Sequence, residues 1–449
     1  MDASHLTRRK FLGGAAAAAT VTIVPAHVLG GPKHTPPSEK LNIACIGIGG
    51  KGRSDVASVR SENIVALCDV DQVRGASSFK AFPKAKRYKD FREMLEKEEK
   101  NIDAVMVSTP DHTHAVAAMA ALKMGKHVYC QKPLAHDIHE VRALTGEARK
   151  RGLVTQMGIQ IHATDQMKLG VEMLKAGMIG KVHRVDVWSC KGKRTISTNM
   201  PTKPLPGMPV PGTLEWDLWV GPAPFRAYNK AYCPGRWRRW WDFGCGRLGD
   251  MGCHIMDPAF WALDLGSPIS VESHPTPFTK QVYPDSNVVR WEFPARGDQP
   301  PVSMTWYDGI NMPFVPPGMP SGFKLPLQGG LYYGDKGTLL FPHVTLKTPK
   351  SVGPVILPPS RMEDFTPPEQ LYKRHTNHYQ EWVAACKGQG KTSTPFDYSG
   401  PLTETVLLGN VAARTAGQRL LWDAGNMKIT NCPEADKSLG RKYRKGWKL

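Results

Sequence analysis

An apolar stretch that runs directly into a glycine-rich turn constrains the fold of this chain most strongly. Residues 41–48 read Leu-Asn-Ile-Ala-Cys-Ile-Gly-Ile, the turn is Gly47-Ile48-Gly49-Gly50-Lys51-Gly52, and residues 53–60 predict a helix. In this order, the glycines permit a tight turn, let the backbone approach a pyrophosphate, and let helix and strand pack closely. The helix N-terminus then faces the phosphate charge. All six residues of the turn are therefore candidate dinucleotide-binding residues.

A second apolar stretch, residues 63–68, ends at Asp69, about 20 residues beyond the first glycine of the turn. A carboxylate at this place accepts hydrogen bonds from the adenosine ribose and repels a 2′-phosphate, which favours NAD over NADP. Arg74 lies close enough in sequence to weaken that preference. The alternative for Asp69 is a loop cap after a strand.

Strands and helices then continue to alternate. Residues 102–107 predict a strand, residues 115–124 a helix and residues 127–130 another strand. This spacing is typical of a doubly wound parallel sheet, a Rossmann domain, whose ligands bind at the carboxyl ends of the strands. His112 and His114 follow the third strand and are expected near the nicotinamide or the substrate, His114 more so; the alternative is that they cap the following helix. The loops at that edge supply the remaining cofactor candidates, Ser108, Thr109, Pro110, His114, Gln131 and Lys132.

The chain has 449 residues, a length that suits two domains. From about residue 155 the pattern changes to strand-like stretches with long loops, and residues 403–414 predict an amphipathic helix. We therefore expect an α+β domain in the second half. The predicted segments are 1–30 (signal), 31–40 (linker), 41–154 (cofactor domain), 155–430 (substrate-binding and oligomerisation domain) and 431–449 (basic tail).

The formal net charge of +19 raises the question of nucleic-acid binding. The basic residues are scattered through the sequence, and their densest cluster, residues 440–448, has no nucleic-acid-binding motif beside it. We therefore expect a solvated basic surface and no nucleic-acid partner. The nine cysteines include no CxxC pair, so they predict buried free thiols and no metal site.

Residues 1–30 have the pattern of a targeting segment. Arg8-Arg9-Lys10-Phe11-Leu12 is a twin-arginine signature, and a mild apolar stretch follows as far as Pro25. That stretch is shorter than the roughly 20 apolar residues of a membrane span. We expect export of the folded protein to the periplasm, either with cleavage or with the segment retained as an anchor; the alternative is an N-terminal tail with chance arginines. An exported dinucleotide enzyme is expected to hold its cofactor tightly.

The combination of four motifs resembles the Gfo/Idh/MocA family, named for glucose–fructose oxidoreductase and inositol dehydrogenase. The motifs are the glycine turn, residues 108–114, residues 125–133 and Gly249-Asp250-Met251-Gly252-Cys253-His254. The resemblance implies a C-terminal domain with an open, mostly antiparallel sheet that forms a homodimer or homotetramer. The chain departs from the family at Gln131-Lys132-Pro133, where Glu-Lys-Pro is usual. The charge support that a carboxylate would give to Lys132 is thereby lost.

Asp250 and His254 are one helical turn apart and share a helix face. The family resemblance implies that Lys132, Asp250 and His254 surround the reacting carbinol. Histidine has an ordinary pKa suited to a base near neutral pH, and lysine can stabilise an alkoxide. The alternatives are a local hydrogen bond between Asp250 and His254, or a metal site that would lack a clear third ligand.

Two groups of residues are candidates for binding the substrate. Gln160 and His162 follow a predicted strand at residues 154–159, and their alternative is a solvated strand end. Tryptophan offers an apolar face for a sugar ring and arginine offers donors for its hydroxyls, although packing is an equal role for any one tryptophan. This second group is Trp237, Arg238, Trp240 and Trp241. His375 and His378 are expected in a helix with a structural role.

These observations predict an oxidoreductase that transfers hydride from a hydroxyl-bearing carbon of a sugar, glycoside or polyol to tightly bound NAD. One alternative is redox-assisted cleavage of a glycoside, with NAD restored in each turnover. A second is a non-catalytic sugar-binding protein with a relic cofactor fold, which the retention of Lys132, Asp250 and His254 opposes.

Overall fold

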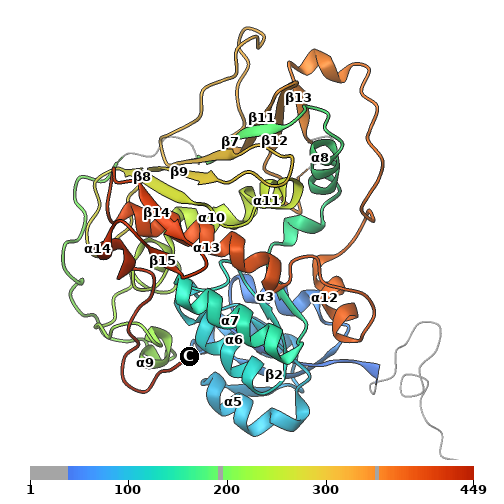
Figure 1. Cartoon of the computed structure of the whole chain (residues 1–449). Coiled ribbons are helices and arrows are strands. Elements are labelled where there is room, and N and C mark those ends of the chain that lie inside the picture. Colours follow the sequence, from blue (N-terminus) through green and yellow to red (C-terminus); the bar gives the residue numbers. More distant parts are fainter. Residues whose placement is uncertain (1–38, 191–195, 349–352) are drawn as a thin grey trace, which may run out of the picture. The chain divides into compact units, whose positions relative to one another are not determined.

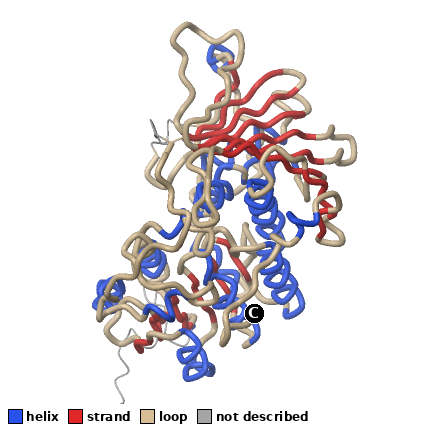
Figure 2. The backbone as a smooth tube through the Cα atoms, turned by 90° about the vertical axis from the view of Figure 1, so that its left-hand side faces the viewer, coloured by secondary structure: helices blue, strands red, loops and turns tan. Residues whose placement is uncertain are grey.

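The fold contains two sheets (Figures 1 and 2). The computed structural model describes residues 39–190, 196–348 and 353–449, so the predicted signal segment and nearly all of the linker lie outside the described residues. The first sheet has six parallel strands in the order β3-β2-β1-β4-β5-β6. Their bounds are β1 Asn42–Ile46, β2 Asn63–Cys68, β3 Lys86–Tyr88, β4 Ala104–Val107, β5 His127–Cys130 and β6 Thr155–Met157. The predicted Rossmann sheet is confirmed.

Five helices follow strands of this sheet, and the helices after β2, β3 and β5 begin at aspartate caps. The Asp71 side chain accepts from two backbone N–H groups of the helix after β2, and Asp137 with Glu140 forms a capping box at the helix after β5. Gly152 ends that helix in a left-handed conformation with φ 62°. The five helices are α3 Lys51–Ser58, α4 Gln72–Ala81, α5 Phe91–Glu98, α6 Asp111–Lys123 and α7 Ile138–Arg151.

The second sheet has nine strands in the order β13-β12-β11-β7-β10-β9-β8-β14-β15. β10 pairs with β7 in parallel, and the other pairings found among the described residues are antiparallel. This confirms the mostly antiparallel sheet. The strands are β7 Val182–Ser189, β8 Ser270–Pro275, β9 Asn287–Phe293, β10 Val302–Asp308, β11 Gln328–Gly334, β12 Gly337–Pro342, β13 Val355–Leu357, β14 Leu420–Asp423 and β15 Lys428–Ile429.

A long helix joins the two sheets. α13 packs against α7 and β6 on one side and against β8 and β9 on the other. Alternate residues of β9 and β10 are buried, because one face of the second sheet packs on helices and the other remains partly exposed. Residues 42–449 form one unit that includes both sheets. The remaining helices are α8 Asp165–Lys175, α9 Trp216–Val220, α10 Gly246–Ile255, α11 Asp257–Leu263, α12 His378–Cys386, α13 Phe396–Ala413 and α14 Pro433–Asp436.

Three sequence expectations differ from the structure. β6 belongs to the first sheet, although it lies just beyond residue 154, where we placed the end of that domain. His375 is not helical: α12 begins at His378, and His375 precedes it with φ 55°. The basic tail is not a solvated surface throughout, because Arg441 packs with a side-chain exposure of 14% against Glu140, whose exposure is 2%.

All nine cysteines lie in the described residues, whereas the apolar stretch of the predicted signal segment does not. None of the nine cysteines forms a disulfide; eight are buried and Cys386 is half-buried. Within the described ranges, no helix combines the length and apolar composition that crossing a bilayer requires.

His378 is buried, and its Nε2 lies 3.0 Å from the carbonyl oxygen of Met157. Desolvation by burial lowers the pKa of His378 to about 3. The unfolded chain takes up this proton below about pH 6.5, whereas the folded chain remains neutral until about pH 3. The free energy of unfolding therefore falls as the pH decreases through that window.

We predict that His378→Gln, whose amide can still donate to Met157, weakens this acid sensitivity. Lowering the pH from 7 to 5 should cost the His378→Gln variant about 2 kcal/mol less unfolding free energy than it costs the wild type. Chemical denaturation at both pH values gives this double difference, in which the contributions of all other titrating groups cancel. Equal losses in the two proteins would show that His378 does not remain neutral in the fold.

Candidate active site

The glycine turn leaves no room for a side chain at Gly47 or Gly52. Gly47 has φ +76°, and a Cβ on Gly52 would lie 1.8 Å from the carbonyl oxygen of Gly47. A Cβ on Gly47 would lie 2.9 Å from backbone atoms of Ser108. The turn is held by hydrogen bonds from Gly47 N to Cys68 O (2.9 Å) and from Gly52 N to Gly49 O (3.0 Å). A bare backbone surface at the start of α3 is what a pyrophosphate requires, so these residues fit the predicted cofactor.

We predict that Gly52→Ala abolishes dinucleotide binding, because the added methyl group must displace the turn at Gly47. Gly146→Ala in α7 is the matched control, since no atom lies within 4 Å of its Cβ position. This control should bind NADH with wild-type affinity, and its free energy of unfolding should be about 1 kcal/mol higher. Isothermal titration with NADH measures both affinities, and wild-type affinity in Gly52→Ala would contradict the assignment of the turn.

Asp69 lies beside the turn at the end of β2. Its Oδ2 accepts from the backbone N–H of Ile48 and of Gly49, each at 3.0 Å, and its Oδ1 accepts from Asp71 N at 2.9 Å. Burial raises the pKa of Asp69 and these three N–H donors act to lower it. The carboxylate thus fixes the turn as well as facing the place predicted for a ribose.

A cavity of about 200 Å³ opens over the turn. It brings together most of the predicted cofactor residues from three strand ends. Arg74 lines it too, as the sequence anticipated, and so do the predicted substrate residues Trp237 and Arg238. The predicted cofactor residues in its wall are Gly47, Gly49, Gly50, Lys51, Asp69, Ser108, Thr109 and Pro110.

Lys132 and Arg238 meet on one carboxylate. Lys132 Nζ and Arg238 Nε each lie 2.9 Å from Asp250 Oδ1, and Lys132 also donates to the carbonyl oxygen of Asp250. Burial acts to raise the pKa of Asp250, but the charges of Lys132 and Arg238 outweigh burial and hold that pKa below its ordinary value. Arg238 also lines the cavity over the glycine turn, so the ion-paired group adjoins that cavity through Arg238, whereas Lys132 and Asp250 are not among its lining residues.

His254 lies on α10, one turn after Asp250. Burial, followed by the charge of Lys132, lowers the pKa of His254 well below its ordinary value. Its Nδ1 is buried and has no hydrogen-bond partner in the described part of the chain. The local Asp250–His254 hydrogen bond is not formed there; Oδ1 of Asp250 bonds Lys132 and Arg238 instead.

Both halves of the described fold match family models. Residues 41–159 match the oxidoreductase family described as an NAD-binding Rossmann fold, and residues 164–289 match the C-terminal alpha/beta domain of the same family. This chain belongs to the Gfo/Idh/MocA oxidoreductase family. Its N-terminal domain is the NAD-binding Rossmann fold of that family.

Named relatives of this Gfo/Idh/MocA chain include dehydrogenases. A myo-inositol 2-dehydrogenase from Thermotoga maritima is 30% identical over 152 residues, which are 32% of this chain and 44% of that protein. A levoglucosan dehydrogenase from Pseudarthrobacter phenanthrenivorans is 30% identical over 93 residues, which are 21% of this chain and 23% of that protein. The chain thus spans less than half the length of these curated relatives.

Solved structures share the fold over nearly their whole length. The WlbA dehydrogenase from Bordetella pertussis, in complex with NADH and UDP-GlcNAcA, has a TM-score of 0.59 and 16% identity over 86% of this chain and 99% of that one. An inositol dehydrogenase homolog from Azotobacter vinelandii, complexed with NADH and myo-inositol, has a TM-score of 0.56 and 18% identity over 85% and 98% of the two chains.

The departure of this Gfo/Idh/MocA member at Gln131 has a structural reason. Gln131 is buried, and its Nε2 donates to Asp55 Oδ2 at 2.9 Å. A glutamate at position 131 would place a second carboxylate against the buried Asp55. The neighbouring carboxylate is that of Asp55 on α3, which pairs with Lys51. The carboxylate that contacts Lys132 is instead Asp250. Gln131 therefore contacts Asp55 on α3 and does not line the cavity over the turn, which corrects its prediction as a direct cofactor contact.

The sequence did not single out Asp55, since it looks like an ordinary helix residue. Its carboxylate is fully buried and accepts from Ser108 Oγ (2.8 Å) and Tyr379 OH (2.6 Å), and it pairs with Lys51 Nζ (2.7 Å). The start of α3, the loop after β4 and α12 are thus tied to one charge. Its pairing with Lys51 looks like an ordinary i, i+4 helix pair, and its other partners come from distant parts of the chain, so no local sequence signal identifies such a hub.

Two further predictions need correction because both side chains are buried. His114 lies with its ring nitrogens 2.8 Å from Pro133 O and 2.9 Å from Thr109 O, so it braces backbone and does not face a ligand. His162 is paired with Asp257 at 2.9 Å and is stacked on Trp261 with ring centroids 3.8 Å apart. Neither side chain is available to the cavity over the glycine turn.

Three predicted substrate residues also lie away from that cavity. Trp240 and Trp241 are buried, and their Nε1 groups donate to Ala231 O at 3.1 Å and Thr279 O at 3.0 Å. Both have the packing role that was the alternative. Gln160 is buried, donates to Tyr129 OH at 2.9 Å, and lines a different cavity, beside α12. Across the described residues, no group of three or more His, Cys, Asp or Glu side chains has a geometry suited to a metal ion.

Proposed function

We propose that this chain is an NAD-dependent oxidoreductase that oxidises a CH–OH group of a sugar, glycoside or polyol. One observation carries the proposal: Lys132 and Arg238 converge on Asp250 at the border of the cavity that holds the glycine turn. The named relatives that act on inositol and levoglucosan support the same substrate class. Bound NAD supplies the acceptor for the hydrogen that leaves the carbinol carbon.

The protein side chains then have separate roles. Lys132 Nζ donates a hydrogen bond to the carbinol oxygen and stabilises the negative charge that develops there. Asp250 remains ionised because its pKa is lowered, so it holds Lys132 in place. We assign the hydroxyl proton to His254, whose ring is neutral and keeps a free lone pair because its pKa is lowered; the same lowering makes it a weak base.

Product analysis tests the proposed function. The purified protein is incubated with NAD and a panel of polyols, free sugars and aryl glycosides, and products are identified by mass spectrometry. A keto product with an equal amount of NADH supports the proposal. An aglycone released without net NADH would show glycoside cleavage instead. Binding of a sugar with no change in sugar or cofactor would show a binding protein; either result overturns the proposal.

We also propose NAD over NADP as the cofactor, because Asp69 stands where a 2′-phosphate would have to fit. Equal affinity for NADH and NADPH by titration would overturn this preference. Arg74 in the same cavity wall is the side chain that would then hold the 2′-phosphate.

Export and self-association are two further proposals. Export is supported by the twin-arginine signature in residues 1–30. Self-association as a homodimer or homotetramer is supported by the partly exposed face of the second sheet. Arg8→Lys with Arg9→Lys should keep the protein in the cytoplasmic fraction, and normal export of that variant would contradict the route. Light scattering of the purified protein gives the oligomeric state, and a monomer at micromolar concentration would exclude self-association.

A further inference from the structure

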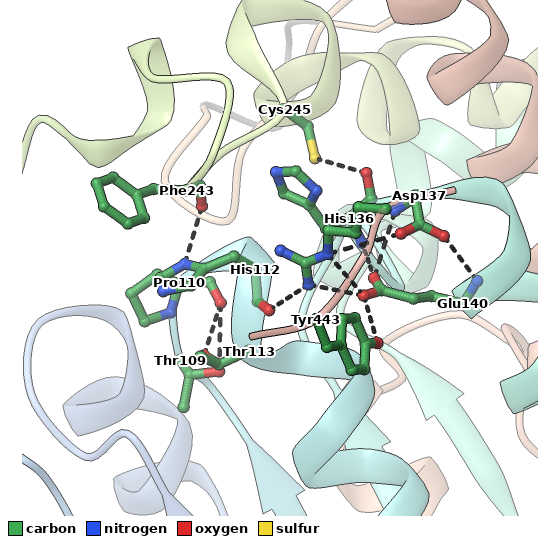
Figure 3. Close-up of polar contacts among 11 residues, drawn as sticks. Thr109, Pro110, His112, Thr113, His136, Asp137, Glu140, Phe243, Cys245 and Tyr443 are labelled. Atoms are coloured by element: carbon green, nitrogen blue, oxygen red, sulfur yellow. Dashed lines mark hydrogen bonds and ion pairs between the residues drawn. The ribbon is translucent and has the colours of Figure 1, made fainter. Parts of the chain in front are cut away.

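The final segment of the chain, residues 439–449, lies on the first sheet's helices. The Leu439 carbonyl accepts from Ile138 N at 3.0 Å and His139 N at 3.3 Å, at the start of α7. Two residues later the Arg441 guanidinium donates to Glu140 and, at 2.6 Å, to the His112 carbonyl. Tyr443 OH donates to the same Glu140 carboxylate at 2.6 Å, as Figure 3 shows. These contacts anchor one end of the segment.

A second anchor lies at α9. Arg444 Nη1 donates to Asp217 Oδ1 at 2.7 Å, its Nε donates to Gly221 O at 2.5 Å, and its backbone N–H donates to Pro222 O at 3.1 Å. α9 also contributes Leu218 and Trp219 to the wall of the cavity over the glycine turn. The segment is therefore attached to an element that already encloses that cavity.

These anchors place the half-buried Trp447 in the wall of the same cavity. The Arg92 guanidinium lies over the indole at 4.4 Å, and the Phe91 ring centroid is 6.1 Å away. Both residues begin α5, which follows β3 at one edge of the sheet, whereas Lys132 follows β5 on the other side of β1. Trp447 is thus on the side of the cavity that carries Asp69, away from the proposed site of oxidation.

We infer that Trp447 is a cofactor-binding residue that forms the adenine-side wall of the NAD site, held there by residues 439–444. This rests on the proposed NAD binding. An indole offers a flat apolar surface on which a purine stacks, and the guanidinium of Arg92 on the indole keeps that surface in place. A cofactor enclosed in this way leaves slowly, which suits an enzyme that must retain it. The family models end at residue 289, so they assign nothing to this segment.

The test separates the two halves of the cofactor. ADP-ribose carries the adenine, whereas nicotinamide mononucleotide does not. Titration calorimetry of cofactor-free protein with each probe is carried out on wild type, Trp447→Ala, Trp447→Phe and the control Lys448→Ala, which changes an exposed neighbour. Trp447→Ala should weaken ADP-ribose about tenfold. The affinity for nicotinamide mononucleotide should be unchanged in Trp447→Ala. Trp447→Phe should retain most of the affinity for ADP-ribose. Release of bound NADH in a chase experiment should accelerate about as much in Trp447→Ala.

Each other outcome has one meaning. Wild-type affinity for ADP-ribose in Trp447→Ala overturns the inference and leaves the proposed function intact. An equal loss for both probes, or an equal loss in Trp447→Phe, shows a structural role for Trp447 and also overturns it. Wild-type protein that binds neither NADH nor ADP-ribose contradicts the proposed function itself. Melting curves of all four proteins establish that the variants are folded.

Discussion

Replacing Lys132 by methionine is expected to lower kcat about a thousandfold while leaving the affinity for NADH within a factor of about two. Methionine keeps much of the apolar stem but removes the cation that meets Asp250 at 2.9 Å. Arg238 still pairs with that carboxylate at 2.9 Å, so the fold should survive the change. Stopped-flow absorbance of NADH formation gives kcat, and titration gives the cofactor affinity.

The control for this prediction is Lys100→Met, which removes an exposed lysine in the 3-10 turn after α5 and should retain full activity. Two outcomes would contradict the role of Lys132. One is a kcat near that of the wild type. The other is a loss that appears entirely in the NADH affinity, which would place Lys132 in cofactor binding alone.

Replacing Arg441 by methionine is expected to lower the free energy of unfolding by about 3 kcal/mol, because it leaves a buried carboxylate without its cation. Glu140 has an exposure of 2%, and Arg441 contacts it through both Nε (3.0 Å) and Nη2 (2.6 Å). Tyr443 OH and the backbone N–H of His136 still donate to Glu140, which limits the loss. Chemical denaturation measures the change.

Two further variants make the Arg441 prediction specific. Lys442→Met alters the exposed neighbour and should be neutral within about 0.5 kcal/mol. Combining Arg441→Met with Glu140→Gln removes both charges, so the double variant should be more stable than the sum of the two single losses. Strict additivity, or a loss for Arg441→Met no larger than for Lys442→Met, would show that the tail does not dock through this pair.

The first sheet and its glycine turn could be predicted from the sequence because their signals are local. Apolar strands, the glycine turn and the acid at the end of β2 each depend on short stretches of chain, and the structure contains all of them in the predicted order. The convergence of Lys132 and Asp250 followed from the family resemblance rather than from spacing, since these residues come from different domains.

The failures share a physical cause. His114, His162 and the tryptophans at 240 and 241 have side chains that suit a ligand site, but each is satisfied by a buried partner elsewhere. Gln131 looked like a lost charge because its partner Asp55 lies on α3, far in sequence from the loop that carries Gln131. The basic composition of the tail predicts a solvated segment. It gives no sign that Arg441 pairs with the buried Glu140 on α7.

The central claim is that a dinucleotide lies on the glycine turn with its reactive end beside Lys132. A crystal structure of the protein with NADH tests this most directly. We expect the pyrophosphate against the backbone amides of residues 48–52 and the nicotinamide close enough to Lys132 for one small carbinol to touch both. A pyrophosphate bound elsewhere, or a nicotinamide at the Asp69 side of the cavity, would contradict it.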